Sequence, residues 1–232
     1  MPEYELSRPG YPALAVTAAM PGDRGSLIDV GAGTGKFSLD AARLRPDVRI
    51  TAIEPSSKMR SGWPFVPENV QLQAGTSENT GLPDAFADRI VWAQSFHWVD
   101  RERTGPEAIR ILKPNGHGVV LANQMNTEVP WVHRLTRIMR SGDVVRKWKP
   151  PELPGFKTSA PKSWAWYQIV TPEGLMTLAR TRSSYIQAKP AIKEKMQSNL
   201  RWYLHDHLGF AKDAVVALPY VTYLWQLDQE PT

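Results

Sequence analysis

Three observations in the sequence predict an α/β fold built on a mostly parallel sheet. Short apolar runs alternate with helix-like stretches through the first half of the chain, which is typical of successive strand–helix units. A glycine-rich segment at residues 31–35 separates the first apolar run from the first of these helices. After Asn123 the alternation stops and helical stretches dominate, which indicates a helical insertion beyond the fifth strand.

The first half provides the parallel strands of the expected sheet. A helix at 35–45 ends before Pro46, because proline cannot continue a helix. A second helix at 104–112 has Pro106 in its first turn, where proline is tolerated, and the turn at 114–116 leads into the fifth strand. Strands are expected at residues 26–30, 48–53, 70–73, 89–93 and 118–122.

The second half is expected to add two strands and several helices. Four prolines between residues 147 and 162 predict a loop. Thr171 followed by Pro172 marks the start of one helix, and Gly209 marks the end of another. Helices are expected at 130–145, from 171 onward and at 190–208, and strands are expected at 164–170 and within 214–227.

The composition is that of an ordinary globular protein, since 42% of the 232 residues are hydrophobic and 22% are charged. No apolar run approaches 18 residues and the N-terminus lacks the apolar core of a signal peptide, so we expect no membrane partner and a cytoplasmic location. The absence of cysteine excludes disulfides, thiolate metal ligands and a cysteine nucleophile. We expect no metal site, because His205 and His207 diverge at a spacing of two on a helix.

The net charge of +5 is spread along the sequence without a basic block. No nucleic-acid-binding motif accompanies this charge, so we expect no nucleic acid partner. The positive excess could instead attract an anionic small molecule. The sequence leaves the oligomeric state open.

The segment GAGTG at residues 31–35 lies where a strand ends and a helix begins, which is where open α/β sheets bind ligands. Glycines allow the backbone to approach a ligand there. A phosphate-binding loop of the form GxxxxGK[ST] does not match, because Lys36 is followed by Phe37, and the dinucleotide form GxGxxG fails as well. The observed pattern is D-x-G-x-G-x-G from Asp29, and a tight turn without a ligand is the alternative interpretation.

Glu54 ends the second expected strand, 19 positions after Gly35. A carboxylate at about this distance from a glycine loop can accept hydrogen bonds from both hydroxyls of a ribose. By itself Glu54 would be a solvated charge at a strand end. Together with the loop it indicates a ribose-binding position.

Several motifs follow one another over nearly the whole chain. They are RPGYP at 8–12, LIDVGAGTGKFS at 27–38, AIEPSSKM at 52–59, GTSENTGLPDAFADRIVWAQSFHWVD at 75–100 and ILKPNG at 111–116, with weaker matches TPEGL at 171–175, RSSYI at 182–186 and LPYVT at 218–222. In this combination and order the sequence resembles the class I S-adenosylmethionine-dependent methyltransferases of type 11. The resemblance is strongest to their trans-aconitate methyltransferase-like branch.

The resemblance implies a Rossmann-like, seven-stranded and mostly parallel sheet with an antiparallel strand seven, flanked by helices. It also implies a helical cap inserted after strand five. The whole chain, 1–232, would form one methyltransferase domain. Its parts would be an N-terminal lid segment at 1–25, a cofactor-binding half at 26–123, a cap insertion at 124–162 and C-terminal strands and helices at 163–232.

The resemblance further implies how S-adenosyl-L-methionine is bound. The glycine loop would line its methionine part, Glu54 would hold the ribose, residues 76–78 would contact the adenine, and the end of strand four would lie under the sulfonium. The sequence departs from the family at Thr76, where an acidic residue is common. The cofactor residues implied are Tyr4, Arg8, Gly31, Ala32, Gly33, Gly35, Glu54, Pro55, Met59, Thr76, Ser77, Glu78, Gln94 and Ser95.

His97, three residues after Gln94, is the candidate general base of the implied reaction. A histidine titrates near neutral pH, and a base is needed only where the acceptor must lose a proton. The alternative is a loop histidine packed against Trp98. Amino-methylating enzymes of DNA carry an Asn or Asp-Pro-Pro-Tyr segment at the end of strand four. This chain has QSFH there, at residues 94–97, which argues against a nucleic-acid methyltransferase.

The acceptor is expected to be a small molecule, with O-, N- or C-methylation left open. Aromatic side chains that lined the acceptor pocket would favour an aromatic or apolar acceptor, although core packing is the alternative role of such residues. A shared helix face of Arg134, Arg137 and Arg140 is either solvated or, if it lines the pocket, favours a small carboxylic acid. The other functional class left open is a cofactor-binding protein that transfers no methyl group, cyclase-like or regulatory. The candidate substrate-binding residues are Tyr11, Trp98, Trp131 and Trp164.

Overall fold

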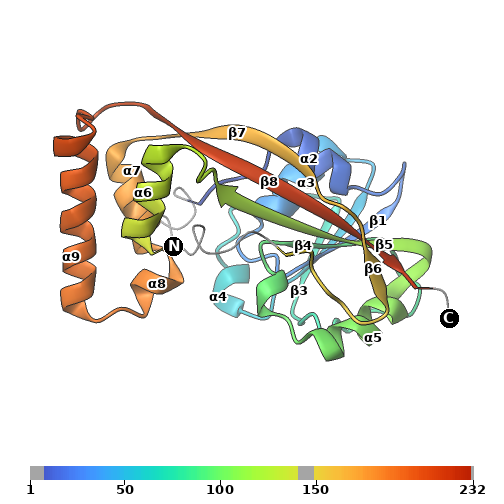
Figure 1. Ribbon diagram of the computed structural model, residues 1–232. Coiled ribbons are helices and arrows are strands. Elements are labelled where there is room, and N and C mark those ends of the chain that lie inside the picture. Colours follow the sequence, from blue (N-terminus) through green and yellow to red (C-terminus); the bar gives the residue numbers. More distant parts are fainter. Residues whose placement is uncertain (1–7, 141–148, 231–232) are drawn as a thin grey trace. The chain divides into compact units, whose positions relative to one another are not determined.

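The computed structural model describes residues 8–140 and 149–230 (Figure 1). Strands and helices alternate through the first half of the chain, and four helical segments lie between the last two strands. The elements are α2 (Ala13–Ala19), β1 (Ser26–Val30), α3 (Lys36–Leu44), β2 (Arg49–Ile53), α4 (Ser57–Arg60), β3 (Val70–Gln73), β4 (Ala87–Ala93), η1 (Phe96–Trp98), α5 (Arg101–Ile111), β5 (Leu112–Met125), α6 (Pro130–Met139), β6 (Phe156–Thr158), β7 (Lys162–Val170), α7 (Pro172–Arg180), α8 (Ser183–Ile186), α9 (Pro190–Arg201), η2 (Trp202–His207) and β8 (Val216–Gln229).

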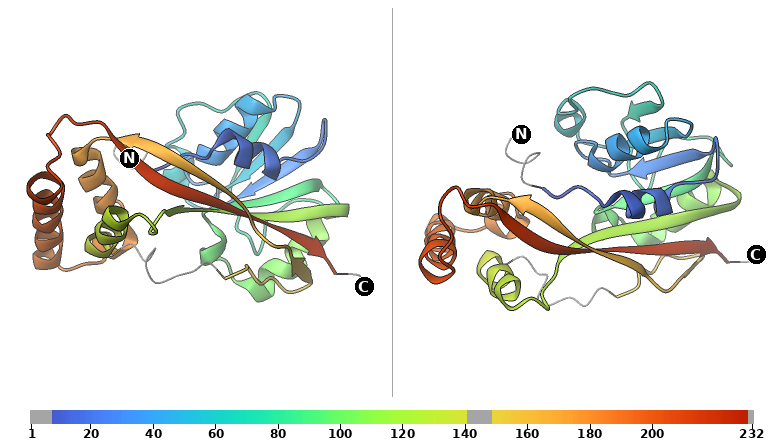
Figure 2. Two further views of the ribbon diagram at one scale, coloured as in Figure 1. Left: turned by 45° about the horizontal axis from the view of Figure 1, so that its top comes forward. Right: turned by 90° about the horizontal axis from the view of Figure 1, so that it is seen from above.

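The strands form one sheet in the order β3-β2-β1-β4-β5-β8-β6, and β7 pairs with β8. The pairs β1–β2, β1–β4, β2–β3 and β4–β5 are parallel. The last strand, β8, is antiparallel to β6 and runs opposite to its neighbour β5 (Figure 1). Figure 2 shows α2 and α3 on one face of the parallel strands and α5 on the other. The expected α/β class, with a mostly parallel sheet and an antiparallel last strand, is confirmed.

Within the described residues the sheet has eight strands, one more than the expected seven. The additional strand is β6, which lies in the proline-rich segment that we expected to be a loop. Its three residues pair antiparallel with β8, from Phe156 beside Gln229 to Thr158 beside Leu227. A strand of this length has no alternation of its own, so only its pairing with β8 reveals it.

Several boundaries differ from the sequence prediction. β5 begins at Leu112 and contains the expected turn, because its pairing with β4 shifts between Ala87 and Arg89 and Asn115 adopts a left-handed φ of 66°. The helix expected at 130–145 ends at Met139, and the rest of that range lies beyond the described residues. The helix expected at 190–208 continues past Arg201 as a π-helical segment, η2. Three helices, α2, α4 and α8, were not expected.

The chain divides into two compact units. We call residues 10–123, 150–164 and 222–232 the sheet unit, and residues 1–9, 124–149 and 165–221 the helical unit. The core of the sheet unit packs α2 and α3 on the parallel strands, and the core of the helical unit is formed mainly by α6, α7 and α9. Buried members of the first core include Val16, Leu27, Phe37, Ile50 and Leu121, and those of the second include Leu135, Met139, Leu178, Leu200 and Leu204.

Candidate functional site

The glycine loop follows β1 and turns the chain into α3. Gly31, Gly33 and Gly35 have positive φ angles of 72°, 59° and 90°, a region that residues other than glycine rarely adopt. The backbone N–H groups of Gly31 and Ala32 both donate to the carbonyl oxygen of Ile53, at 2.8 and 3.0 Å. Because Val30 and Ile53 are paired in register, the loop lies at the carboxyl ends of β1 and β2, where ligands of open α/β sheets bind.

The three glycines of the loop meet different surroundings. A Cβ atom on Gly31 would lie 2.6 Å from Cβ of Ser95, and one on Gly35 would lie 2.6 Å from the indole ring of Trp63. A Cβ atom on Gly33 would meet no atom of the described chain within 4 Å. The protein's own packing therefore requires Gly31 and Gly35, whereas Gly33 presents bare backbone to open space. That arrangement suits a ligand that approaches the main chain closely.

Glu54, directly after β2, is buried and tied to the loop. Its Oε2 atom accepts a hydrogen bond from the N–H of Gly33 and its Oε1 atom one from the N–H of Ser56, both at 2.9 Å. Each carboxylate oxygen has a further lone pair, so both can still accept hydrogen bonds from vicinal hydroxyls. Next along the chain, Pro55 is exposed and Met59 is half-buried in α4.

Asp29 begins the glycine pattern, although the sequence indicated no role for it. Its carboxyl group is fully buried, and Oδ2 accepts a hydrogen bond from Oγ of Ser38 at 2.6 Å. Burial raises the pKa of Asp29 from 3.8 to about 7; the Ser38 bond opposes this rise and the carboxylate of Glu54 adds to it. Oδ1 is buried without a hydrogen-bond partner among the described residues. The only sequence signal for this group was a charge inside an apolar strand.

The end of β4 lies beside the loop. Ser95 donates from Oγ to the carbonyl oxygen of Val30 at 2.5 Å, which brings its Cβ against Gly31. Gln94 has a left-handed φ of 59°, and its Nε2 atom donates to the carbonyl oxygen of Asn123 at 3.0 Å. The structure thus brings both of these predicted residues to the same edge as the glycine loop.

Residues 76–78 form a tight turn after β3. The Oγ atom of Ser77 accepts a hydrogen bond from the indole N–H of Trp92 at 3.0 Å, so this buried side chain is engaged inside the protein. Oε1 of Glu78 accepts a hydrogen bond from the N–H of Asp100 at 2.9 Å. Partial burial raises the pKa of Glu78, but bonds from Asp100 and Thr76 outweigh it and leave the pKa below its ordinary value. Thr76 is exposed.

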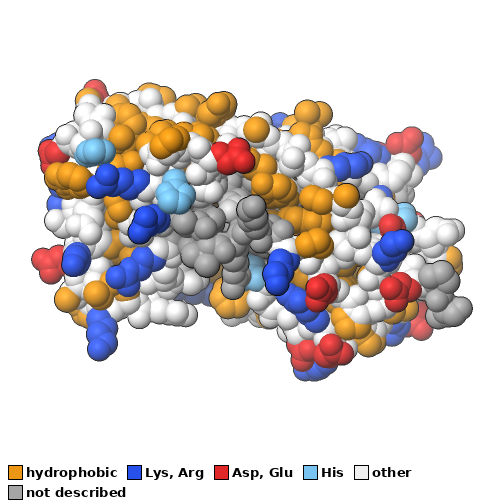
Figure 3. Space-filling view, in the orientation of Figure 1, with side chains coloured by type: hydrophobic (Ala, Val, Ile, Leu, Met, Phe, Trp, Pro, Cys, Tyr) orange, Lys and Arg blue, Asp and Glu red, His pale blue; other side chains and the backbone are white. Residues whose placement is uncertain are grey.

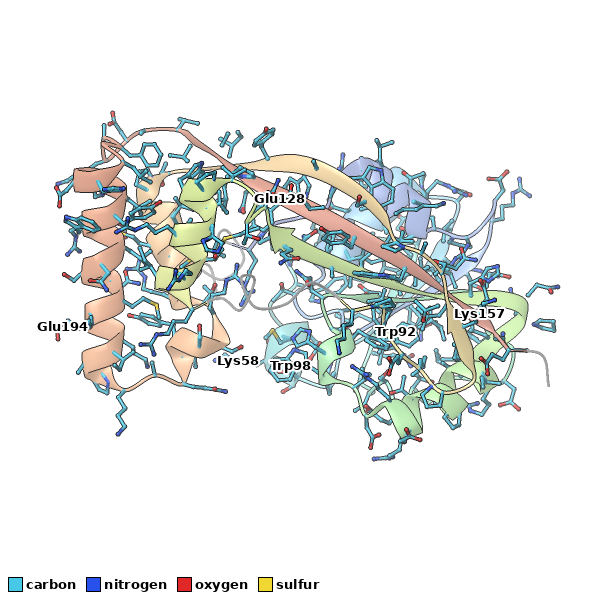
Figure 4. All side chains as sticks on the ribbon, viewed as in Figure 1. Lys58, Trp92, Trp98, Glu128, Lys157 and Glu194 are labelled. Carbon is cyan, nitrogen blue, oxygen red and sulfur yellow. The ribbon has the colours of Figure 1, made fainter. Side chains whose placement is uncertain are left out.

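His97 and Trp98 lie in η1, directly after Ser95. Both side chains are exposed, Trp98 to 71%, and their ring centroids are 4.8 Å apart. Figure 4 labels Trp98 and also Trp92, which lies within β4 and is buried. An exposed indole at the carboxyl end of a sheet strand is an available stacking surface.

Two other aromatic candidates of the sheet unit are packed. The ring of Tyr11 meets that of Phe37 edge to face at 5.8 Å. Trp164, at the start of β7, is half-buried against the core of the sheet unit. Both side chains therefore contribute to core packing, which is the alternative role that the sequence left open.

The remaining predicted residues are not in the sheet unit. Arg8 belongs to the helical unit, where its guanidinium donates to the carbonyl oxygen of Thr181 at 2.8 Å. Trp131 belongs to the same unit and meets Phe210 edge to face at 6.2 Å. Tyr4 lies outside the described residues. The roles of these three residues stay predictions.

The described residues contain no group of three or more His, Asp or Glu side chains suited to a metal ion. None of the helices in the described ranges is long and apolar enough to cross a membrane. The groups that the described residues offer at the loop are the open backbone at Gly33, the carboxyl groups of Asp29 and Glu54, and the polar end of β4.

Comparison with known proteins identifies the family. A model described as "Methyltransferase domain" matches residues 28–120, which include the glycine loop, Glu54 and the end of β4. An uncharacterized methyltransferase of Mycobacterium tuberculosis is 34% identical over 221 residues, which cover 94% of this chain and 89% of the relative. An uncharacterized methyltransferase-like protein of Schizosaccharomyces pombe is 30% identical over 213 residues, covering 85% of this chain and 81% of the relative.

The chain belongs to the class I S-adenosylmethionine-dependent methyltransferases.

Solved structures show the same fold at low sequence identity. A protein of Anaeromyxobacter dehalogenans assigned as a type II methyltransferase superposes with a TM-score of 0.68 at 20% identity, over 96% of this methyltransferase and 97% of the other chain. A geranyl diphosphate methyltransferase, solved in complex with S-adenosylmethionine, reaches a TM-score of 0.50 at 15% identity, over 94% and 83% of the two chains. Membership of the trans-aconitate-like branch stays a prediction.

Proposed function

We propose that this methyltransferase binds S-adenosyl-L-methionine on the glycine loop and transfers its methyl group to a small-molecule acceptor. The observation that carries the proposal is the shared position of Gly33 and Glu54. Gly33 offers backbone facing open space, and Glu54 is held beside it with lone pairs left for two hydroxyls. Oδ1 of Asp29, buried without a hydrogen-bond partner among the described residues, is a further polar atom next to the loop.

The proposed roles of the chain follow from these positions. The loop would contact the methionine part, Glu54 would hold the ribose, Pro55, Met59 and residues 76–78 would surround the adenine, and Gln94 and Ser95 would lie under the sulfonium. When bound, this cofactor supplies a methyl group on a positively charged sulfur that leaves as a neutral thioether. The protein's own contribution is to hold the acceptor atom in line behind the methyl group, which accounts for most of the acceleration in such reactions.

His97 is proposed as the base that removes a proton from the acceptor. Its exposed imidazole lies two residues after Ser95, in η1, just beyond the carboxyl end of β4. An imidazole accepts a proton near neutral pH, which suits a hydroxyl or ring acceptor. The neighbouring Trp98 indole would stack on a planar acceptor. We therefore favour an aromatic or apolar small molecule that carries an ionisable group.

A small carboxylic acid is the second candidate acceptor, because the two units differ in net charge. The helical unit has 14 Lys and Arg against 8 Asp and Glu, a net charge of +6, whereas the sheet unit has 14 against 15, a net charge of −1. Figure 3 shows many Lys and Arg side chains over the end of the helical unit formed by α6 and α9. A positive surface raises the local concentration of anionic substrates.

Incubation with methyl-labelled S-adenosylmethionine and a panel of phenols, indoles and small carboxylic acids tests the proposal. Transfer of label to phenols or indoles supports the aromatic acceptor, and transfer to carboxylic acids alone supports the second candidate. Cofactor binding without labelling of any small molecule, but with labelling of protein or nucleic acid, would contradict a small-molecule acceptor. The cytoplasmic location stays a prediction.

A further inference from the structure

Asn123, near the end of β5, connects three other segments of the sheet unit. Its side-chain Nδ2 atom donates to the carbonyl oxygen of Gly10 at 2.8 Å, and its Oδ1 atom accepts a hydrogen bond from the hydroxyl of Thr222 at 2.6 Å. Its main-chain carbonyl oxygen accepts from Nε2 of Gln94 at 3.0 Å. Asn123 is only 7% exposed, so these bonds are shielded from water and are sensitive to geometry.

Gln94 is the partner of Asn123 that lies at the candidate cofactor site. Its backbone has a φ of 59°, a conformation that residues other than glycine keep only where the surroundings impose it. Two contacts with β5 impose it here: the N–H of Gln94 donates to the carbonyl oxygen of Leu121, and its side chain is bound to Asn123. The residue that follows, Ser95, packs against the glycine loop at Gly31. A shift of Asn123 would therefore move Gln94 and, through Ser95, the backbone of the glycine loop at Gly31.

Asn123 and its two side-chain partners have a common place in the chain. Gly10, Asn123 and Thr222 are each the sheet-unit residue at a boundary between the two units. A single side-chain amide thus sets, within the sheet unit, the relative positions of three of these boundary residues. No motif of the sequence marks Asn123 for this role, because its partners are 113, 29 and 99 positions away.

We propose that Asn123 is a positioning residue of the methyl-transfer site. It holds Gln94 in its left-handed conformation and anchors the segment that begins at Gly10 to the same point. The proposal rests on the proposed role of Gln94 at the cofactor. In the described chain the side chain of Asn123 bonds to Gly10 and Thr222 and its main-chain carbonyl oxygen accepts from Gln94, so its effect on the cofactor passes through Gln94.

A matched pair of substitutions separates positioning from simple stabilisation. Asn123→Asp keeps the oxygen that accepts from Thr222 but replaces the donor to Gly10 with an acceptor. Asn69→Asp makes the same change at the opposite, amino-terminal edge of the parallel strands, where Nδ2 of Asn69 donates to the carbonyl oxygen of Val48 at 2.9 Å. Both variants should lose thermal stability, because each leaves a carbonyl oxygen without its amide donor.

The experiment measures the Kd for S-adenosylmethionine by calorimetry, together with Tm, for wild type, both Asp variants, Gln94→Ala and the double variant Asn123→Asp/Gln94→Ala. We expect Asn123→Asp to raise Kd about tenfold, because loss of the bond to Gly10 would displace Asn123 and with it Gln94, and Asn69→Asp to leave Kd unchanged. In the double variant the Asn123 change should add little to the Gln94 change, because residues that act through one another are not additive.

Three outcomes would overturn the inference. Equal Kd values for Asn123→Asp and wild type, equal losses of affinity in the two Asp variants, or full additivity in the double variant would each assign Asn123 a structural role only. If Asn123→Asp does not fold, Thr222→Val replaces it, because this change removes only the hydroxyl that donates to Asn123. The Kd of Thr222→Val should rise about threefold, a smaller effect than that of Asn123→Asp. Wild type that binds no S-adenosylmethionine would contradict the proposed function itself, which is a distinct result.

Discussion

The N–H of Gly33 donates a hydrogen bond to the carboxylate of Glu54 at 2.9 Å, across 21 positions of sequence. The bond joins the residue at the middle of the glycine loop to the residue that directly follows β2. One carboxylate therefore both shapes the loop and remains able to accept two hydroxyl groups. The two features that point to S-adenosylmethionine form a single structural unit.

Gly33→Ala tests whether the open backbone at Gly33 is used for binding. Its Cβ would meet no atom of the described chain, so the protein should fold, with a loss of about 1–2 kcal/mol for the left-handed conformation. The methyl group would enter the space proposed for the cofactor, and the Kd for S-adenosylmethionine should rise at least about tenfold.

Gly81→Ala is the matched control, because Gly81 also has a positive φ, 72°, and a Cβ there would meet no neighbour within 4 Å. It should lose similar stability by urea unfolding and keep wild-type affinity in calorimetry. Unchanged affinity in Gly33→Ala would remove Gly33 from the cofactor site.

Glu54→Gln should weaken both the loop and the cofactor site. The NH₂ group of the new glutamine side chain would face the backbone N–H of either Gly33 or Ser56. That backbone N–H would then be a buried donor without an acceptor, at a cost of about 1–3 kcal/mol. The Kd for S-adenosylmethionine should rise at least about tenfold, because one ribose acceptor is lost as well. Calorimetry and urea unfolding measure the two effects, and Glu68→Gln, at an exposed position, should change neither. Normal affinity in Glu54→Gln would argue against the ribose role.

Asp29 should make the stability of the ligand-free protein depend on pH. Its pKa in the folded protein is about 7 against an ordinary 3.8, so the folded state keeps a proton that the unfolded chain releases in this range. The contribution of Asp29 to the free energy of unfolding is therefore complete below about pH 4 and is lost as the pH rises through about 7.

Urea unfolding between about pH 4.5 and 7.5 measures this dependence. Asp29→Asn keeps an oxygen for the Ser38 hydroxyl and cannot titrate, so its stability should decline less with pH than that of wild type. Asp213→Asn, at an exposed position, should reproduce the wild-type slope. Parallel slopes for Asp29→Asn and wild type would show that the Asp29 carboxyl is not the group responsible.

His97→Ala should slow methyl transfer without affecting cofactor binding. Loss of a general base typically costs about 10²–10⁴-fold in rate, and an exposed side chain contributes little to folding. The measurements are kcat with an acceptor identified from the panel and the Kd for S-adenosylmethionine. Near-normal turnover with intact binding would reduce His97 to a loop histidine beside Trp98.

Contiguous sequence was sufficient to predict the first strand, the glycine loop and the helix after it. The strand at 26–30, the loop and the helix after it are neighbours in the chain, and their bounds agree with β1 and α3 within one residue. The strand at 70–73 agrees with β3 fully. Local patterning failed for β6, because three residues in a proline-rich segment become a strand only through pairing with β8.

The residues that shape the site were harder to predict. Ser95 against Gly31 and Trp63 against Gly35 are contacts between segments 64 and 28 positions apart, and no periodicity reports them. Asp29 was visible as part of the pattern, but its full burial and raised pKa follow from the strands and helices packed around it. The division into two units likewise follows from contacts between distant segments, so it cannot be obtained from sequence order.

The sequence by itself determined the fold class, because strand, glycine loop and helix are consecutive, and it determined the methyltransferase family through motifs that follow one another along the chain. Only the tertiary structure decided that Glu54 bonds to Gly33, that Asp29 is buried, and that Asn123 joins Gly10, Gln94 and Thr222. The physical reason is that a hydrogen bond requires two groups within about 3 Å in a defined direction. Strand order and register create that proximity, and neither is a property of any single segment.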